Sequence, residues 1–137
     1  MKAGIIGFIS LLIVVLISCQ SQDELEFKRY YTTGKVIYQS KCQNCHGDNG
    51  QGLSALIPPL TDSVYLQANK HHLPCIIKYG LNKPIQVHGK GFLGQMPATD
   101  LAPVELAEVI TYITNSFGNK MGVTTTRMAE DGLKGCK

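Results

Sequence analysis

The sequence has no dense run of basic residues. Its 137 residues include 13 Lys and Arg and 10 Asp and Glu, so the formal net charge is only +3. Nucleic-acid-binding modules carry a concentrated basic patch or stripe, and this weak, scattered charge argues against such a partner. The sequence also lacks an internal repeat, and its length supports one small domain. What the protein contacts must therefore be inferred from local features.

No apolar run reaches the roughly 20 residues that a membrane-spanning helix needs. The longest one is N-terminal, where Met1-Lys2 is followed by residues 3–18 without a charge. A short basic start before an apolar stretch predicts an export signal over residues 1–18. An uncleaved membrane anchor is the alternative interpretation. Both would hold the domain outside the cytoplasm.

The end of this signal, Leu16-Ile17-Ser18-Cys19, resembles a bacterial lipobox. Lipoprotein signals are cut before such a cysteine, which is then acylated, so the resemblance implies lipid attachment at Cys19. The next residue is Gln20 rather than the aspartate that retains enterobacterial lipoproteins in the inner membrane, which favours the outer membrane. We therefore expect an exported protein, lipid-anchored on the periplasmic side of a bacterial cell envelope.

Polar and turn-forming residues divide the rest of the chain. Residues 19–33 are polar and predict a tether, residues 34–119 predict the domain, and residues 120–137 predict a C-terminal extension. Residues 81–97 are rich in Gly and Pro and predict an irregular loop. Apolar spacing and terminal Pro, Gly or Thr residues predict helices over residues 35–45, 62–68 (capped by Thr61), 75–79 and 103–117. The predicted fold class is all-α.

The segment Cys42-Gln43-Asn44-Cys45-His46 carries the chemistry. Two cysteines three residues apart on a helical turn can form thioethers with the two vinyl groups of haem, and the following histidine can then ligate the iron. A structural zinc site would need two further ligands at short spacing, and only adjacent histidines are available. A thioredoxin-like cysteine pair needs no histidine. The segment predicts one haem c, covalently bound through Cys42 and Cys45 and ligated by His46.

The sixth ligand of the iron decides what such a haem can do. Met96 precedes Pro97 in the loop before the last predicted helix, and we predict that its sulfur binds the iron. The alternatives are methionines beyond that helix, or histidines that would give two histidine ligands: Met121, Met128, His71, His72 and His88.

The order of these features resembles that of a class I (mono-haem) cytochrome c over residues 34–119. The resemblance rests on five blocks, whose combined spacing is more specific than the haem motif alone: Gly34-x3-Tyr38-x3-Cys42, the CQNCHG run, Pro58-Pro59-Leu60, Ile85-x-Val87-x-Gly89-x2-Phe92-x3-Met96-Pro97, and Leu101–Ile113. It implies a small cytochrome c fold, whose N- and C-terminal helices cross beside the haem.

The resemblance also implies particular contacts. Gly34 and Tyr38 should meet Val109 and Tyr112 where the two helices cross, so that Tyr38 belongs to the haem surroundings. The Pro58 carbonyl should accept the ring N–H of the proximal histidine, which would orient the imidazole and raise its basicity. The chain has no tryptophan, which some relatives place near a haem propionate. In its place Tyr65, Asn69 or a histidine would have to serve.

Cysteine usage predicts one further bond. If lipid takes Cys19 and haem takes Cys42 and Cys45, one pair remains, Cys75 and Cys136. In an exported protein such a pair predicts a disulfide. It would tie the C-terminal extension to the domain, and closing a loop of about sixty residues would stabilise the fold by roughly 4 kcal/mol. A buried free thiol at Cys75 is the alternative.

Ligation by His46 and Met96 would leave no open position on the iron, so it predicts one-electron transfer without catalytic residues, and no enzyme. We expect a monomer that carries electrons between redox proteins such as a dehydrogenase, a reductase or a terminal oxidase. The alternatives are a fixed subunit of a larger oxidoreductase, and a haem sensor or enzyme with a labile sixth ligand. Lysines around the expected haem could steer an acidic partner or be ordinary solvated side chains: Lys35, Lys41, Lys70, Lys78 and Lys90.

Overall fold

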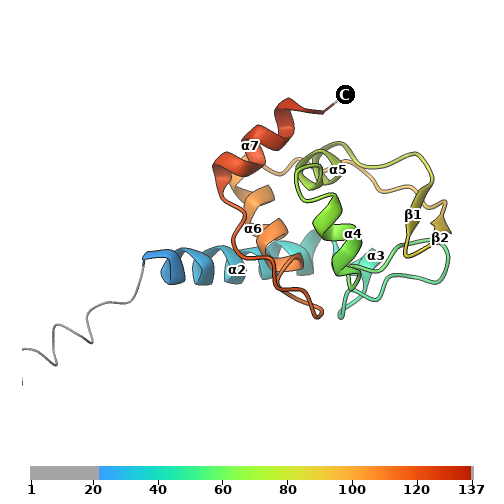
Figure 1. The fold of residues 1–137 in the computed structure, drawn as a ribbon, viewed down its shortest axis with the longest axis horizontal. Helices are drawn as coiled ribbons and strands as arrows, with labels where there is room; N and C mark the ends of the chain where they lie inside the picture. Colours follow the sequence, from blue (N-terminus) through green and yellow to red (C-terminus); the bar gives the residue numbers. More distant parts are fainter. Residues whose placement is uncertain (1–21, 137) are drawn as a thin grey trace, which may run out of the picture.

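The computed structural model describes residues 22–136, and within them the fold is mostly helical (Figure 1), as predicted. The elements follow in the order α2 (Gln22–Lys41), α3 (Gln43–His46), α4 (Ser63–Ala68), α5 (Leu73–Tyr79), β1 (Ile85–Val87), β2 (Lys90–Phe92), α6 (Pro103–Ile113) and α7 (Thr126–Lys134). The predicted signal over residues 1–18 and the lipid site Cys19 lie outside the described residues. None of the helices within residues 22–136 has the length and apolar character needed to cross a membrane.

Helices α2 and α6 pack against each other at the centre of the domain. Gly34 lies at the contact, and a Cβ atom there would overlap the carbonyl oxygen of Glu108, so the two backbones can approach this closely only at a glycine. The Tyr38 ring packs at a tilt against the Tyr112 ring, with 5.3 Å between ring centroids. The expected pairing of the first and last domain helices is confirmed, with Gly34 against the Glu108 carbonyl and the Cβ atom of Tyr112.

Helix α2 begins at Gln22, well before the predicted start at residue 35, so most of the predicted tether is helical. Its first turn carries acidic residues that suit the helix dipole, and Glu24 pairs with Lys28 at 2.7 Å. Further along, Tyr30 is buried and its hydroxyl lies 2.8 Å from Oγ1 of Thr126. The C-terminal extension therefore provides packing for this part of α2, and no local pattern could show it.

Helix α6 begins at Pro103 as predicted but ends earlier than predicted. At the start, Ala102 has no side chain to cap the helix, but its backbone N–H donates to the Glu105 carboxylate at 2.7 Å. The helix ends at Ile113 rather than residue 117. The Thr114 hydroxyl donates to a carbonyl of the last turn at 2.7 Å, and Phe117 has a φ of 58°, which a right-handed helix cannot contain.

Two other predictions were wrong in detail. Asp62, not Thr61, caps α4, because its carboxylate accepts the backbone N–H of Tyr65 at 2.9 Å. The segment 81–97, predicted to be irregular, contains the antiparallel hairpin of β1 and β2. The turn at His88-Gly89 has φ values of 52° and 73°, which suit a two-residue hairpin connection.

The C-terminal extension forms α7, which packs on α5 and α6 (Figure 1). Thr125 caps it by accepting the backbone N–H of Met128 at 3.3 Å. In the structure Cys75 and Cys136 are joined by a disulfide, with their Cα atoms 5.5 Å apart. The extension is thus tied to α5 on one side and to α6 on the other.

Candidate functional site

The CQNCH segment lies where α2 ends and the short helix α3 begins. Backbone N–H groups of Cys45 and His46 both donate to the carbonyl of Cys42, at 3.1 and 3.0 Å, which closes a single helical turn. Cys42 is half-buried, whereas Cys45 is exposed. Burial, followed by the charge of Cys45, raises the pKa of the Cys42 thiol to about 11, so it is protonated at neutral pH. One turn therefore presents both sulfurs and the imidazole.

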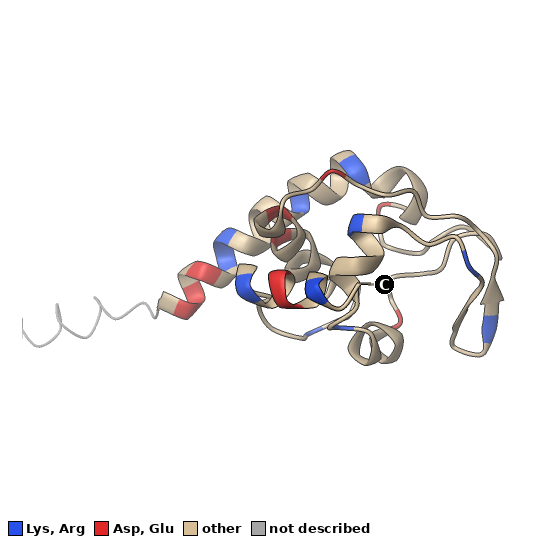
Figure 2. Ribbon diagram, turned by 90° about the horizontal axis from the view of Figure 1, so that it is seen from above, with Lys and Arg blue, Asp and Glu red and all other residues tan. Residues whose placement is uncertain are grey.

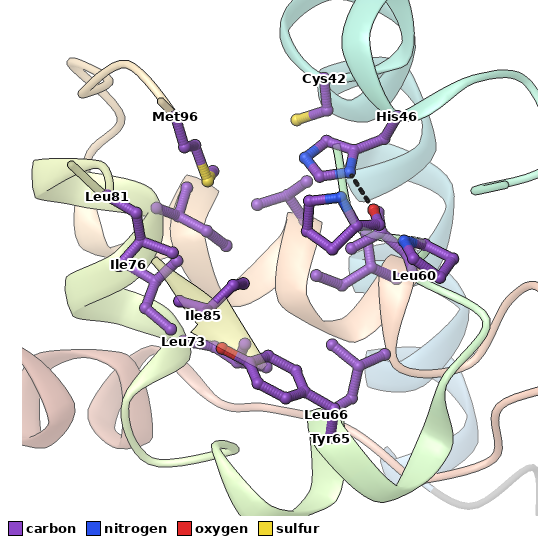
Figure 3. A pocket seen from close by; sticks show the side chains of 15 residues that line it. Cys42, His46, Leu60, Tyr65, Leu66, Leu73, Ile76, Leu81, Ile85 and Met96 are labelled. Atoms are coloured by element: carbon purple, nitrogen blue, oxygen red, sulfur yellow. Dashed lines mark hydrogen bonds between the residues drawn. The ribbon is translucent and has the colours of Figure 1, made fainter. Parts of the chain in front are cut away.

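His46 is buried, with 9% of its surface exposed. Its Nδ1–H donates to the Pro58 carbonyl at 3.2 Å. Because Nδ1 holds the proton, Nε2 carries the free lone pair, and it points into a cavity (Figure 3). Burial lowers the pKa of His46 against the opposing effect of this hydrogen bond, which favours the neutral ring that a metal requires.

That cavity has an almost entirely apolar lining. A concave, mostly apolar lining with a few well-placed polar groups is typical of sites for small molecules and cofactors. Met96 lies on the side opposite His46, with its sulfur directed inwards (Figure 3). The remaining walls come from the loop after α3 and from helices α4, α5 and α6, through residues such as Leu60, Leu66, Leu73, Ile77, Val109 and Ile113.

A second cavity, also lined mostly by apolar groups, adjoins the first. The two share five lining residues: His46, Pro58, Leu81, Ile85 and Met96. Cys42 lines the first cavity and Cys45 the second. His46 and Met96 thus line both apolar cavities, and each cavity is also lined by one of the two cysteines.

The other candidate iron ligands lie elsewhere. His88 is on the hairpin turn, its side chain is 89% exposed, and it pairs with Asp62 at 3.3 Å. His71 and His72 are exposed. Neither these histidines nor Met121 and Met128 line either cavity. Of the ligand pairs weighed from the sequence, only His46 and Met96 meet at one site.

Comparison with known proteins agrees with this geometry. The profile of the Cytochrome c family matches residues 31–116, well over half of the chain. The chain belongs to the cytochrome c family. It is also 32% identical over 91 residues to cytochrome c-552 of Thermus thermophilus and, equally, to the cytochrome c-552 of a named strain of the same species. These alignments cover 63% of this chain and 69% and 61% of the two relatives.

Family membership makes the chain a carrier of electrons through haem rather than an enzyme. The residues present fit a covalently bound haem c. The chain offers two sulfurs on one turn, a neutral imidazole with a free nitrogen, and an apolar space that a flat, mostly apolar ring would fill. Cys42, Cys45, His46 and Met96 are the residues that would hold it.

Tyr38 lines neither cavity, so it contacts this cytochrome c site only indirectly, through the backbone next to His46. It is almost fully buried, and its hydroxyl donates to the carbonyl of Gly47 at 2.6 Å. Burial raises the pKa of Tyr38, so it remains a neutral donor. The hydrogen bond fixes the turn that directly follows His46.

Sequence reasoning did not single out the apolar side chains of α4 and α5 as cavity walls. Leu66, Leu73, Ile76 and Ile77 face the cavity. Their apolar spacing within the predicted short helices was the available signal. Tyr65 also lines the cavity, whereas Asn69 lies in a neighbouring groove and donates to the Tyr65 carbonyl at 2.9 Å.

The lysines do not form one uniform cationic face. Figure 2 shows the basic positions spread over several elements. Lys70 and Lys78 donate to the backbone carbonyls of Met121 and Leu101, at 3.0 and 2.7 Å. Lys41 lies 3.5 Å from Asp100. Because these three groups have partners within the chain, they are less available for an acidic partner than the sequence suggests.

Proposed function

We propose that this chain is a membrane-anchored mono-haem c-type cytochrome, which carries single electrons between redox partners through an iron held by His46 and Met96. One observation carries the proposal: the free nitrogen of a buried histidine and the sulfur of Met96 face the same apolar cavity, which Cys42 also lines, while Cys45 lines the adjoining one. Family membership supplies the haem and the electron transfer. The ligand pair, the anchor and the partners are our proposal.

The haem, when bound, supplies a one-electron iron couple. On one side, the Pro58 carbonyl holds Nδ1 of His46, which fixes the tautomer and increases the basicity of Nε2. On the other side, the Met96 thioether would be a weak donor to the iron, which would favour the ferrous state and raise the potential. The apolar walls exclude water and disfavour the additional positive charge of the ferric state. If His46 and Met96 both held the iron, no position on it would remain for a substrate.

Rigid ligands suit this role, because electron transfer is fast when the atoms around the iron change position little between the two oxidation states. His46 is fixed by the Pro58 carbonyl and by the single helical turn that carries it. Met96 is held by two backbone hydrogen bonds to Leu81, at 2.9 and 2.8 Å. Both ligands are therefore constrained through the backbone and not by side-chain packing alone.

We further propose export and lipid anchoring, with residues 1–18 as the signal and Cys19 as the acylated residue. The sequence motif supports this proposal. Several acyl chains give stable membrane attachment, whereas one short chain does not. An anchored domain meets its partners at a high effective concentration without additional contacts. The exposed first turns of α2 would separate the domain from the lipid.

The decisive test of ligation is the absorption spectrum of the ferric, haem-loaded full chain. Iron bound by methionine sulfur gives a weak far-red band, which we expect in the wild type and not in Met96→Ala. Met128→Ala is the matched control, because Met128 lines neither cavity and should leave the band intact. A wild type without the band would overturn the ligand pair and favour the sensor or enzyme interpretation.

A second experiment tests the anchor and the choice between shuttle and subunit. We expect the wild type to fractionate with membranes and to carry acyl groups by mass spectrometry, and Cys19→Ala to lose the acyl groups. After mild detergent extraction, a shuttle should elute as a small species. Elution with a large oxidoreductase would instead identify a fixed subunit.

A further inference from the structure

The chain segment that carries Met96 is bound to the C-terminal end of α5. Besides the two hydrogen bonds between Met96 and Leu81, Thr99 donates twice: its N–H to the Lys78 carbonyl at 3.1 Å, and its hydroxyl to the Ile77 carbonyl at 2.9 Å. These are carbonyls of the last turn, which a helix leaves without internal partners. The position of Met96 is therefore set by the position of α5.

Helix α5 is too short to be stable without tertiary contacts. It has seven residues, and helices this short depend on tertiary packing. One face of it lines the cavity through Leu73, Ile76 and Ile77. Gly80 ends it with a φ of 76° and touches the Met96 carbonyl so closely that a Cβ atom would overlap it. Any shift of α5 would move both the cavity wall and the methionine.

The C-terminal extension contacts α5 at Pro74 and Cys75, which line neither cavity. Cys75 in α5 is bonded to Cys136 at the end of the extension. In α7, Gly132 is so close to α5 that a Cβ atom would come within 2.8 Å of the His71 carbonyl and of the Pro74 ring. The disulfide and the close contact at Gly132 together restrict the position of α5 relative to α7.

The extension is itself fixed to α6 and to α2, the helix that leads into the haem motif. Thr111 in α6 exchanges two hydrogen bonds with Thr124, at 2.9 and 3.3 Å, inside the core. Tyr30 of α2 is 2.8 Å from Thr126. Since α2 leads directly into Cys42, a continuous set of contacts connects the histidine side of the cavity with the methionine side. Helix α5 also packs directly on α6, so the extension adds a second connection.

We propose that the C-terminal extension positions the sixth iron ligand: α7 and the Cys75–Cys136 disulfide hold α5, and α5 holds Met96 over the cavity. The extension lies beyond the part of the chain that matches the family profile, which ends at residue 116. This inference rests on the proposed ligation by Met96. It assigns Cys75, Cys136 and Gly132 as positioning residues that do not touch the cofactor.

The test measures how fast Met96 leaves the iron. Haem-loaded ferric protein is mixed with excess imidazole, which can bind only after the methionine has dissociated, so the limiting rate reports the opening of that bond. We expect Gly132→Ala to raise this rate about tenfold, which corresponds to about 1.4 kcal/mol of barrier. Gly135→Ala is the matched control: its Cβ atom would have its nearest neighbour at an ordinary 3.5 Å, and the rate should not change.

A second variant tests the disulfide. Cys75→Ser/Cys136→Ser should raise the limiting rate in the same direction and weaken the far-red band, at a temperature where circular dichroism shows it folded. Rates within twofold of wild type in both variants, with only a lower melting temperature, would overturn the inference and leave the extension a merely stabilising element. A wild type without the far-red band would overturn the proposed ligation by Met96 itself. This outcome differs from a wild type that has the band and variants with unchanged rates, which would overturn only the role of the extension.

Discussion

Asn119 connects two parts of the site, and its replacement by alanine should be costly. The side chain is 2% exposed. Its amide donates to the Leu60 carbonyl at 2.8 Å and to the Ile113 carbonyl at 3.0 Å. Leu60 lies two residues after the proline whose carbonyl orients His46, and Ile113 is the last residue of α6. One side chain therefore joins the loop behind the histidine to the end of the central helix.

The magnitude follows from counting the groups left without partners. Asn119→Ala removes the donor from two carbonyls, and each loss costs about 1–3 kcal/mol. The wild type has an opposing term, because Oδ1 of Asn119 is buried without a partner and its removal relieves a penalty of similar size. The balance is a net destabilisation of about 2 kcal/mol. For a domain of this size, that lowers the melting temperature by about 8 °C.

Urea unfolding of the haem-loaded protein, followed by far-ultraviolet circular dichroism, measures this loss directly. The midpoint should fall without a change in slope, because the surface exposed on unfolding is the same. Asn82→Ala is the control, since Asn82 is exposed and should change stability by less than about 0.5 kcal/mol. If the two variants lose the same small amount, Asn119 does not join the loop to α6 as described.

Three further changes test other parts of the fold. Gly34→Ala should destabilise the fold by about 2 kcal/mol or more in the same unfolding assay, because the added Cβ meets the Glu108 carbonyl, which cannot move aside. Thr33→Ala, at an exposed position on the same helix, is the control and should be nearly neutral. A G34A variant that is equally neutral would refute the close contact. Removing the disulfide, whose cysteines are 61 residues apart, should cost about 4 kcal/mol in the chain-entropy treatment, and a loss under about 1 kcal/mol would refute it. Burial raises the pKa of Glu108 above its usual 4.5, so this group should cost stability as the pH rises from 4.5 through the folded-state pKa. In Glu108→Gln that decline should shrink, which melting temperatures at a series of pH values would show; parallel curves would contradict it.

The sequence was informative where chemistry demands fixed spacing. A thioether pair and an axial histidine require their five-residue motif, and the structure places Cys42, Cys45 and His46 on one turn. Met96 was predicted as the sixth ligand because, once a haem at His46 is expected, a Met-Pro in the loop before the last helix is the favoured candidate, and the structure places it across the cavity from His46. Pro103 and Glu105 likewise marked the start of α6 correctly. In each case the signal lay within a few neighbouring residues.

What the sequence did not reveal depends on distant partners. The first turns of α2 carry no strong apolar pattern, and Tyr30 becomes buried against Thr126. The hairpin of β1 and β2 has strands of only three residues, and its turn is His-Gly rather than the common Asn-Gly, so local signals were weak. The choice of Asp62 over Thr61 as the cap of α4 is a boundary shift of one residue, which propensity alone does not resolve.

The two sides of the cavity are held in different ways. The histidine side rests on α2, a helix of 20 residues that packs along α6, and His46 belongs to the turn that follows it. The methionine side rests on a seven-residue helix and a loop, connected mostly by hydrogen bonds to carbonyls at the end of α5. Local opening is drawn from regions with the fewest buried contacts, so the methionine side should open first. Under the proposed ligation, contacts that hold α5 would therefore act where dissociation of Met96 begins, whereas the same contacts on α2 would stabilise the more extensively packed side.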